Sequence, residues 1–360
     1  MINNIYKRKD GRYEGRIPIY NCDGNRKYKY FFGKTKEEVI EKITKYRESL
    51  NTSEEKNITF RSAYTDWFQS ISYRIKESTA ANYILKADKH ILPYFRDSKI
   101  SDITSASVYQ FICDKQNKGL SNRYISDILV LMKSVFKFAS RKYHTPNPME
   151  DIVMPKKQKS NIRLLTNDEE QRLMGILKDN LNLTSIGIIL ARMTGLRIGE
   201  LCALQWKDIN LDLKTITVSK TIQRIQTKNG NSKTKLIITE PKSETSKRVI
   251  PIPNCIIEIL TKSKASDDDY ILSGNEKPVE PRVMQYRFAK ILKNGNLPSV
   301  HFHALRHSFA SCCIKLGFDI KALSEILGHS SVEITANTYT HINIDDKQAE
   351  INSITNVLAI

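Results

Sequence analysis

The segment TGLRIGELCALQWKDI, residues 194–209, has the pattern of a tight turn between two helices. The apolar run SIGIILARM before it predicts a helix that ends at Gly195, because glycine commonly follows the last turn of a helix. A second helix is expected to begin near Gly199. Arg197 then lies in the turn, where Glu200 could orient its guanidinium by a bidentate pair. Taken alone, an arginine in such a turn is usually a solvated charge or a cap.

Helices predominate on both sides of this turn, and strand-like segments interrupt them. Thr166 with Glu169 forms a capping box that opens the first helix of this region. KTITVS, KLIITE and KRVIPIP are rich in β-branched residues, and Asn229-Gly230 between the first two is a hairpin signal. Lys242 follows a proline and precedes a polar run, so we expect it in a turn between two strands. A lysine in a turn is most often plain surface.

A third motif, HFHALRHSFA at 301–310, places His303 and Arg306 three residues apart on one helix face. His303 and His307, four residues apart, also resemble a pair of zinc ligands. The metalloprotease pattern requires Glu beside the first histidine, however, and Ala304 stands there. A metal-dependent hydrolase is therefore the least favoured interpretation of these residues.

The fourth motif is EILGHSSVEITANTYTHI, in which Gly328 is expected to end a helix and His329 follows it. Tyr339 lies ten residues later, near the end of a short predicted helix. A lone tyrosine at this place would ordinarily be core or surface. The tail after it, NIDDKQAEINSITNVLAI, has helical spacing, and it could pack on its own domain or on a neighbouring protomer.

Residues 1–50 are expected to form a small sheet followed by a helix. Short runs rich in Tyr, Ile and Phe are separated by two Asp-Gly pairs, which are strong hairpin signals, and Thr35 with Glu38 forms a capping box. Nine basic and three acidic residues occur through residue 34, and basic residues alternate with aromatic ones. This composition suits a sheet laid on DNA, where cations bind phosphates. A merely soluble basic face explains it equally well.

Residues 58–150 have a helical pattern throughout and predict a unit of four helices. The polar stretch 51–57 precedes this unit, and the basic stretch MPKKQKSN, 154–161, follows it as a second linker. The clearest helix covers 121–143. Apolar residues at three- and four-residue steps mark one buried face there: Ile125, Ile128, Leu129, Met132, Val135, Phe136 and Ala139.

The composition bounds the classes of function. The 360 residues include 57 Lys and Arg against 39 Asp and Glu, a net charge of +18. Such an excess indicates a polyanionic partner, most often nucleic acid, with an anionic membrane surface as the rival. No run approaches the roughly 18 apolar residues that span a bilayer, and the N-terminus lacks the apolar core of a signal peptide. The six cysteines show no CxxC pair and fit buried thiols in a reducing cytosol.

The order and spacing of these motifs closely resemble the tyrosine recombinase (phage integrase) family. Arg in TGLRIGEL, Lys in a strand turn, H-x-L-R-H, L-G-H-S and Tyr follow one another between about 165 and 345, and no element of the active-site motif is missing. In this pattern the chain resembles the integrases of Gram-positive phages and conjugative transposons.

The resemblance implies a mainly α fold with small β-sheets (α+β) in three domains. Residues 1–50, a three-stranded sheet plus a helix, would bind arm-type DNA. Residues 58–150 would be a helical core-binding (SAM-like) domain of four helices. Residues 162–360 would be a mixed α/β catalytic domain with a C-terminal tail.

The resemblance also implies roles for individual residues. Six of them match the catalytic positions of the family: Arg197, Lys242, His303, Arg306, His329 and Tyr339. Tyr339 would be the nucleophile that forms an O-(3′-phospho-DNA)-tyrosine intermediate, and the two arginines would hold the scissile phosphate. Lys242 would protonate the leaving 5′-hydroxyl, and His307 would have only a supporting role. Basic residues of the sheet and of the second linker are expected to bind DNA: Arg12, Arg16, Arg26, Lys27, Lys29, Lys156, Lys157 and Lys159.

The chemistry of these groups is coherent without the family. Two guanidinium groups can neutralise the charge of a five-coordinate phosphate, so neither a metal nor any other cofactor is expected. Tyrosine has an ordinary pKa of about 10, but neighbouring cations favour its phenolate and a histidine can accept its proton. A phosphotyrosine keeps the energy of the broken bond, so religation needs no ATP.

We therefore expect a site-specific integrase that integrates and excises a mobile element, such as a prophage or a conjugative transposon, in the bacterial cytoplasm. The expected partners are double-stranded DNA with core-type and arm-type sites, three further copies in a homotetramer, an excisionase and a host DNA-bending protein, with no membrane. An Xer-like recombinase that resolves dimers, or a type IB topoisomerase, would not need the N-terminal sheet. A catalytically silent DNA-binding regulator would not need Tyr339 with both arginines.

Overall fold

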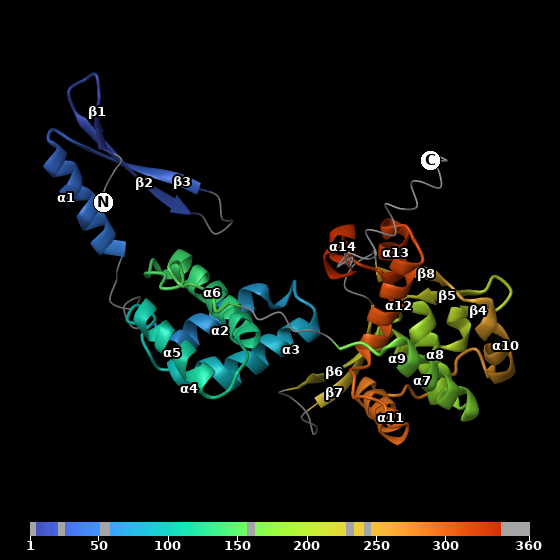
Figure 1. Ribbon diagram of the computed structural model, residues 1–360. Helices are drawn as coiled ribbons and strands as arrows, with labels where there is room; N and C mark the ends of the chain where they lie inside the picture. The colour runs from blue at the N-terminus through green and yellow to red at the C-terminus, as the bar shows by residue number, and fades with distance from the viewer. Residues whose placement is uncertain are drawn as a thin grey trace, which may run out of the picture. The chain divides into compact units, whose positions relative to one another are not determined.

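The computed structural model describes residues 5–20, 26–50, 58–156, 163–227, 234–240 and 246–339. The chain divides into two compact units, Met1–Lys159 and Ser160–Ile360 (Figure 1). Helices predominate in both units. In the described residues the first unit contains one small antiparallel sheet and the second contains two. The predicted α+β fold class is confirmed.

The N-terminal sheet is a three-stranded antiparallel meander in the order β1-β2-β3. Its strands are β1 (Ile5–Lys7), β2 (Tyr13–Tyr20) and β3 (Arg26–Gly33), and helix α1 (Lys36–Leu50) follows. The helix packs on one face of the sheet through Val39 and Ile43, which are fully buried. A Cβ added at Gly15 would lie 2.8 Å from side-chain carbons of both residues, so glycine allows the helix to approach β2.

Four helices, as predicted, form the described part of the first unit after α1. They are α2 (Phe60–Ser72), a compound helix, α5 (Ser105–Asn117) and α6 (Asn122–Tyr143). The compound helix consists of α3 (Glu77–Lys86), the π-helical turn η2 (Ala87–Ile91) and α4 (Leu92–Phe95). Pro93 has no N–H to donate and lies at the start of α4, directly after the π-helical turn η2. All seven residues of the predicted α6 stripe are fully buried.

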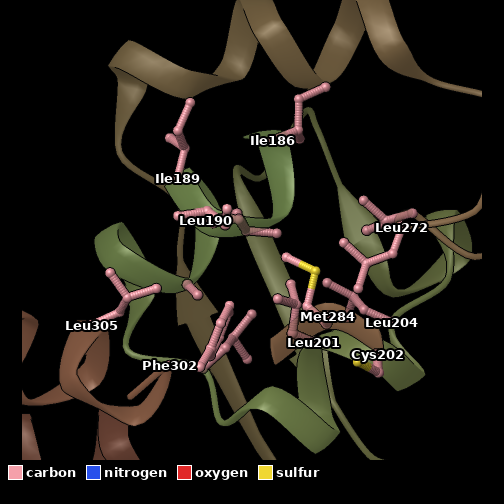
Figure 2. Close-up of a cluster of buried hydrophobic side chains, with 14 of the residues drawn as sticks. Ile186, Ile189, Leu190, Leu201, Cys202, Leu204, Leu272, Met284, Phe302 and Leu305 are labelled. Carbon is pink, nitrogen blue, oxygen red and sulfur yellow. The ribbon is translucent and has the colours of Figure 1, made fainter. Parts of the chain in front are cut away.

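Helices surround a main hydrophobic core in the second unit. They are α7 (Asn167–Asp179), α8 (Leu183–Thr194), α9 (Ile198–Ala203), α10 (Asn254–Ser263), α11 (Pro281–Asn294), α12 (His303–Lys315), α13 (Ile320–Leu327) and α14 (Val332–Tyr339). Helix α8 is central: Figure 2 shows its residues Ile186 and Leu190 in one cluster with Leu201 and Met284. A smaller hydrophobic cluster lies between α12 and α13. The predicted capping box of Thr166 with Glu169 is present at the start of α7.

Two small sheets complete the second unit. The first has the order β4-β5-β8, with β4 (Ile209–Asn210), β5 (Thr215–Val218) and β8 (Arg248–Pro251). The second pairs β6 (Thr221–Gln226) with β7 (Thr234–Thr239). The three predicted strands correspond to β5, β7 and β8, whereas β4 and β6 were not predicted. Asn229-Gly230 and Lys242 lie outside the described residues.

The structure bears on two expectations from the sequence, which concern membrane-spanning segments and the burial of the cysteines. In the part that the structure describes, every helix is too short or too polar to cross a membrane. Cys202 and Cys313 are buried thiols, but Cys113 and Cys255 are exposed. The expectation of buried cysteines is therefore correct only for some of them.

Candidate active site

The turn between α8 and α9 presents Arg197 as predicted. Gly195 ends α8 in the left-handed region, with φ of 68°, and Arg197 immediately precedes α9. Glu200 accepts two hydrogen bonds from Arg197: one from its backbone N–H at 2.9 Å and one from Nη1 at 2.8 Å. The carboxylate therefore fixes both the backbone and the guanidinium of Arg197.

The bidentate partner of Glu200 is a different arginine, Arg248, which the sequence analysis did not identify. Arg248 begins strand β8, and its Nη1 and Nη2 lie 3.1 and 2.9 Å from the two carboxylate oxygens of Glu200. The two side chains are only 6% and 4% exposed. Burial raises the pKa of Glu200, but the bonds from Arg248 and the charge of Arg197 outweigh it, so the net pKa is lowered and the carboxylate is ionised.

Arg306 lies on α12 and is 2% exposed. Its Nη1 donates to the carbonyl of Gly195 at 2.8 Å, and its Nη2 donates to the carbonyl of Leu327 at 2.7 Å. The Nη2 of Arg197 donates to the next carbonyl, that of Gly328, at 2.9 Å. The ends of α8 and α13 and the starts of α9 and α12 therefore meet at two guanidinium groups, although these segments are far apart in the sequence.

Two predicted histidines lie close enough to these arginines for their charges to matter. His329 follows Gly328, and its Nδ1 lies 2.8 Å from Oγ1 of the buried Thr335. Burial, with the charges of Arg306 and Arg197, lowers the pKa of His329 to about 4. The imidazole is therefore neutral near pH 7 and can accept a proton.

His303 is the first residue of α12 and keeps part of its ring exposed. Burial of the rest, with the neighbouring His307 and Arg306, lowers its pKa to about 4. The His303 and His307 rings meet edge to face with centroids 4.9 Å apart. Zinc sites use at least three protein ligands, and no third His, Cys, Asp or Glu joins this pair within the described ranges.

An open hollow of about 510 Å³ lies beside His303. Residues of α11 and of the segment before α12 line it, among them Arg282, Tyr286 and His301. The hollow therefore opens beside His303, and its lining includes neither Arg197 nor Arg306.

Two predicted catalytic residues have no described side chain. Tyr339 is the last residue of α14, so its backbone position at the end of a short helix is as predicted. Lys242 falls between β7 and β8, outside the described residues. Their places relative to the two arginines stay predictions.

The predicted DNA-binding residues of the sheet do not share one face. Arg16 is paired with Tyr30 on the face that α1 leaves open, and its guanidinium lies 5.1 Å from the Tyr28 ring centroid. Lys29 points to the other face, where its Nζ lies 3.8 Å above the ring of Tyr46 on α1. Arg12 forms an exposed ion pair with Asp10 at 2.8 Å.

The remaining predicted DNA-binding residues are described only in part. Arg26 and Lys27 begin β3, and their side chains are outside the described set. Lys156 is exposed, whereas Lys157 and Lys159 lie outside the described ranges.

A cationic surface outside the predicted DNA-binding residues lies on the four-helix part. An open hollow of about 380 Å³ is lined by Arg74, Lys137 and Arg141, with the aromatic rings of Trp67 and Phe138 among its walls. Its lining, all within the described part of the chain, includes no carboxylate. We call this feature, with its three cations, the basic hollow. The sequence indicates part of this surface, because Lys137 and Arg141 are four residues apart and off the apolar stripe of α6, but neither was among the predicted DNA-binding residues.

Comparisons with protein families match most of the chain. The model described as "Phage integrase family" matches residues 163–345, and the model described as "Phage integrase, N-terminal SAM-like domain" matches residues 59–115. A tyrosine recombinase XerC-like protein of Caldanaerobacter subterraneus subsp. tengcongensis is 29% identical over 350 residues, which covers 87% of this chain and 88% of the relative. The ICEBs1 integrase of Bacillus subtilis is 25% identical and covers 88% of this chain and 89% of its own length.

Solved structures agree with the fold. The Tn1549 transposon integrase, in complex with a circular intermediate DNA, has a TM-score of 0.68 at 22% identity and covers 82% of this chain and 99% of its own. A lambda integrase tetramer bound to a Holliday junction has a TM-score of 0.60 at 19% identity and covers 94% of this chain and 95% of its own.

Proposed function

Because the chain belongs to the phage integrase family of tyrosine recombinases, a family of DNA strand-exchange enzymes, we propose the chemistry and the DNA contacts of its individual residues. Tyr339 attacks a phosphodiester and forms a 3′-phosphotyrosine, and the freed 5′-hydroxyl leaves. A 5′-hydroxyl of another strand then attacks the phosphotyrosine, so the DNA is rejoined and Tyr339 is released. In each of the two steps one phosphorus–oxygen bond forms and another breaks, so the four-coordinate phosphate is restored after the five-coordinate transition state.

The convergence of Arg197 and Arg306 on the turn between α13 and α14 is the observation that carries this proposal. Each guanidinium is held by carbonyl oxygens of that turn. Such fixed cations can stabilise a phosphate that gains charge in the transition state, and they need no reorganisation during the reaction. Two preorganised guanidinium groups support a reaction without a divalent metal, and the covalent intermediate supports one without ATP.

Proton transfer is assigned to the neighbouring bases and acids. His329, neutral near pH 7, is suited to accept the proton of the Tyr339 hydroxyl, and His303 flanks the same two arginines. Lys242 is assigned the proton donation to the leaving 5′-hydroxyl by its match to the family pattern. His307, whose pKa burial and Arg306 lower, orients His303 through their ring contact.

Three parts of the chain are proposed to contact DNA. Residues 1–50 bind arm-type sites through the face of the sheet that α1 leaves open, and residues 58–150 bind core-type sites through the basic hollow. Residues 162–360, which include the C-terminal tail, form the catalytic domain that cleaves the DNA. The charge of +18 and the absence of carboxylates from the described lining of the basic hollow support contacts with phosphates.

The assembly and the biological role follow from the same premise. We propose that four copies act together on two duplexes, with an excisionase and a host DNA-bending protein setting the direction. The three-stranded sheet favours the integration and excision of a mobile element over dimer resolution, because a simple resolving recombinase usually has no such part.

Covalent trapping tests the proposal. The protein is incubated in EDTA, without ATP, with nicked duplexes that carry candidate attachment sites, so that cleavage releases a short fragment and traps the adduct. A shifted band on a denaturing gel, absent with Tyr339→Phe, is the expected result. Cleavage that survives in Tyr339→Phe would refute the nucleophile assignment, and salt-sensitive binding without any adduct would favour a silent regulator.

A further inference from the structure

We propose that Arg248 is a positioning residue for the reaction, which it serves by holding Arg197 and the turn of His329 in place. The inference rests on the proposed function, because it concerns the residues assigned there to the phosphate and the proton. Arg248 is itself almost completely buried and is not proposed to touch DNA.

The first observation is the shared carboxylate. The carboxylate of Glu200 accepts hydrogen bonds from both terminal nitrogens of Arg248. The same two oxygens also accept from Nη1 and from the backbone N–H of Arg197. One buried carboxylate thus carries two guanidinium groups. Arg197 is 34% exposed on its side chain, so it faces solvent while its partner stays inside. Any change in the Glu200–Arg248 pair therefore moves the support of Arg197.

The second observation is the contact of Arg248 with the other half of the site. Its Nε donates to the carbonyl of Ile326 at 2.6 Å, in the last turn of α13. A Cβ added at Gly328 would lie 3.0 Å from Cδ and from Nη1 of Arg248. The arginine thus lies directly beneath the turn that leads to His329, and the carbonyl of Gly328 in that turn is the acceptor of Arg197.

The third observation is the place of Arg248 in the chain. It is the first residue of β8, paired with Val218 of β5, and its Nη1 also donates to the carbonyl of Ser246 at 3.1 Å. Ser246 is the first described residue after the segment that contains Lys242. One side chain therefore links Ser246, the support of Arg197 and the turn of His329.

The geometry demands arginine rather than a generic cation. The acceptors of Arg248 lie in three directions: the two Glu200 oxygens, the Ile326 carbonyl and the Ser246 carbonyl. A planar guanidinium addresses all of them at once, whereas a lysine ammonium presents its three donors from one point. Arg248→Lys should therefore keep the buried charge but lose the positions of Arg197 and His329.

A matched pair in the same unit separates positioning from mere stability. Arg192 and Glu170 also form a two-point ion pair, with Nε and Nη2 of Arg192 at 3.1 and 2.6 Å from the carboxylate oxygens, and both are partly buried. Arg192 belongs to neither the proposed catalytic residues nor the basic hollow. Full-length Arg248→Lys and Arg192→Lys are compared for melting temperature, for DNA affinity and for single-turnover cleavage of a nicked core site.

The expected result is a selective loss. Arg248→Lys should cleave more than tenfold more slowly while binding DNA within about threefold of wild type, and Arg192→Lys should cleave within about twofold at a similar melting temperature. Cleavage by folded Arg248→Lys at the wild-type rate would overturn the proposal, as would an equal loss in Arg192→Lys.

A measurement that needs no activity keeps this proposal distinct from the proposed function. Burial lowers the pKa of His329 most, and the positive charges of Arg306, Arg197 and Arg248 lower it further. The His329 signal is assigned in nuclear magnetic resonance spectra of ¹³C-labelled histidine by its loss in His329→Asn. The pKa of His329 should be higher in Arg248→Gln than in wild type. In Arg248→Lys, which keeps the charge, the chemical shift of the His329 ring should change. An unaltered His329 resonance in both variants would overturn the proposal whether or not the wild type forms an adduct. A wild type without an adduct, with these shifts present, would count against the proposed function alone.

Discussion

Arg197 and Arg306 bind the carbonyls of two consecutive residues: Arg306 Nη2 lies 2.7 Å from the oxygen of Leu327, and Arg197 Nη2 lies 2.9 Å from that of Gly328. Consecutive carbonyls in a helix point the same way, but Gly328 has φ of 64° and leaves the helix at that point. The left-handed glycine thus allows one short turn to hold two guanidinium groups that come from different helices. The spacing of the two cations depends on the conformation of this turn.

Arg197→Lys is expected to lower cleavage about a hundredfold or more, which is the usual loss when one preorganised donor is removed. Lysine keeps the positive charge but cannot bind Glu200, Gly328 and a phosphate in fixed directions. Single-turnover cleavage of a nicked site measures the effect, and DNA affinity is measured in parallel. Recombination near the wild-type rate would contradict the role of the guanidinium fork.

Gly328→Ala tests the turn itself. Alanine at a left-handed position costs about 1–2 kcal/mol, and the added methyl group would also meet Arg248 at 3.0 Å. Gly317 is the matched control, since it has φ of 76° and open space around its Cβ position. We expect Gly317→Ala to lower only the melting temperature and Gly328→Ala to lower both melting temperature and cleavage. Equal cleavage by the two variants would show that the turn does not position the arginines.

The histidines predict an acid limb of activity and of stability. The pKa of His329 is about 4 in the folded protein, against about 6.5 for an ordinary histidine. A lowered pKa means that folding favours the neutral form, so this contribution to stability is present above pH 6.5 and is lost as pH falls toward 4. Cleavage should therefore be flat with respect to His329 between pH 6.5 and 8. Denaturant unfolding from pH 7 to pH 4.5 should show a smaller loss of stability in His329→Gln than in wild type.

Features set by neighbouring residues were predictable from the sequence, and features set by distant partners were not. Gly195 and Gly328 end their helices as predicted, because the left-handed conformation that glycine tolerates is a local signal. The Glu200–Arg248 pair joins residues that are 48 apart, so no local pattern indicates it. The sequence therefore indicates only the pair of Glu200 with Arg197.

Strand β6 was missed for a related reason. Its buried residues, Ile222 and Ile225, are three apart, so the alternation expected of a half-buried strand does not appear. Pairing with β7, which comes from later in the chain, imposes the extended conformation. The roles of Tyr339 and Lys242 likewise came from the family pattern, and their side chains lie outside the described residues.

The basic hollow predicts a salt-dependent contribution to binding of core-type DNA. Each phosphate that a cation neutralises adds about 0.9 to the slope of log affinity against log salt concentration. A triple variant that combines Arg74→Gln, Lys137→Gln and Arg141→Gln should bind DNA more weakly. The magnitude of its salt slope should fall by one to three times the amount expected for one phosphate contact. The combined Arg74→Lys and Arg141→Lys variant keeps the charge and should keep the slope. An unchanged slope in the triple variant would place the DNA elsewhere on the helical part.

The two faces of the N-terminal sheet offer a direct test of which one binds arm-type DNA. Arg16 and Lys29 are close in the sheet, because Arg16 pairs with Tyr30 and Lys29 pairs with Ile17. Their side chains nevertheless lie on opposite faces. Lys29 lies against Tyr46 of α1, whereas Arg16 lies among aromatic residues of the open face. Arg16→Ala should weaken binding of arm-type duplexes and lower the salt slope by about the amount expected for one phosphate contact, and Lys29→Ala should bind within about twofold of wild type. Cleavage of a core site serves as the internal control and should be equal in both variants. A larger loss in Lys29→Ala would mean that DNA approaches the sheet from the side of α1, which would require the helix to share the contact.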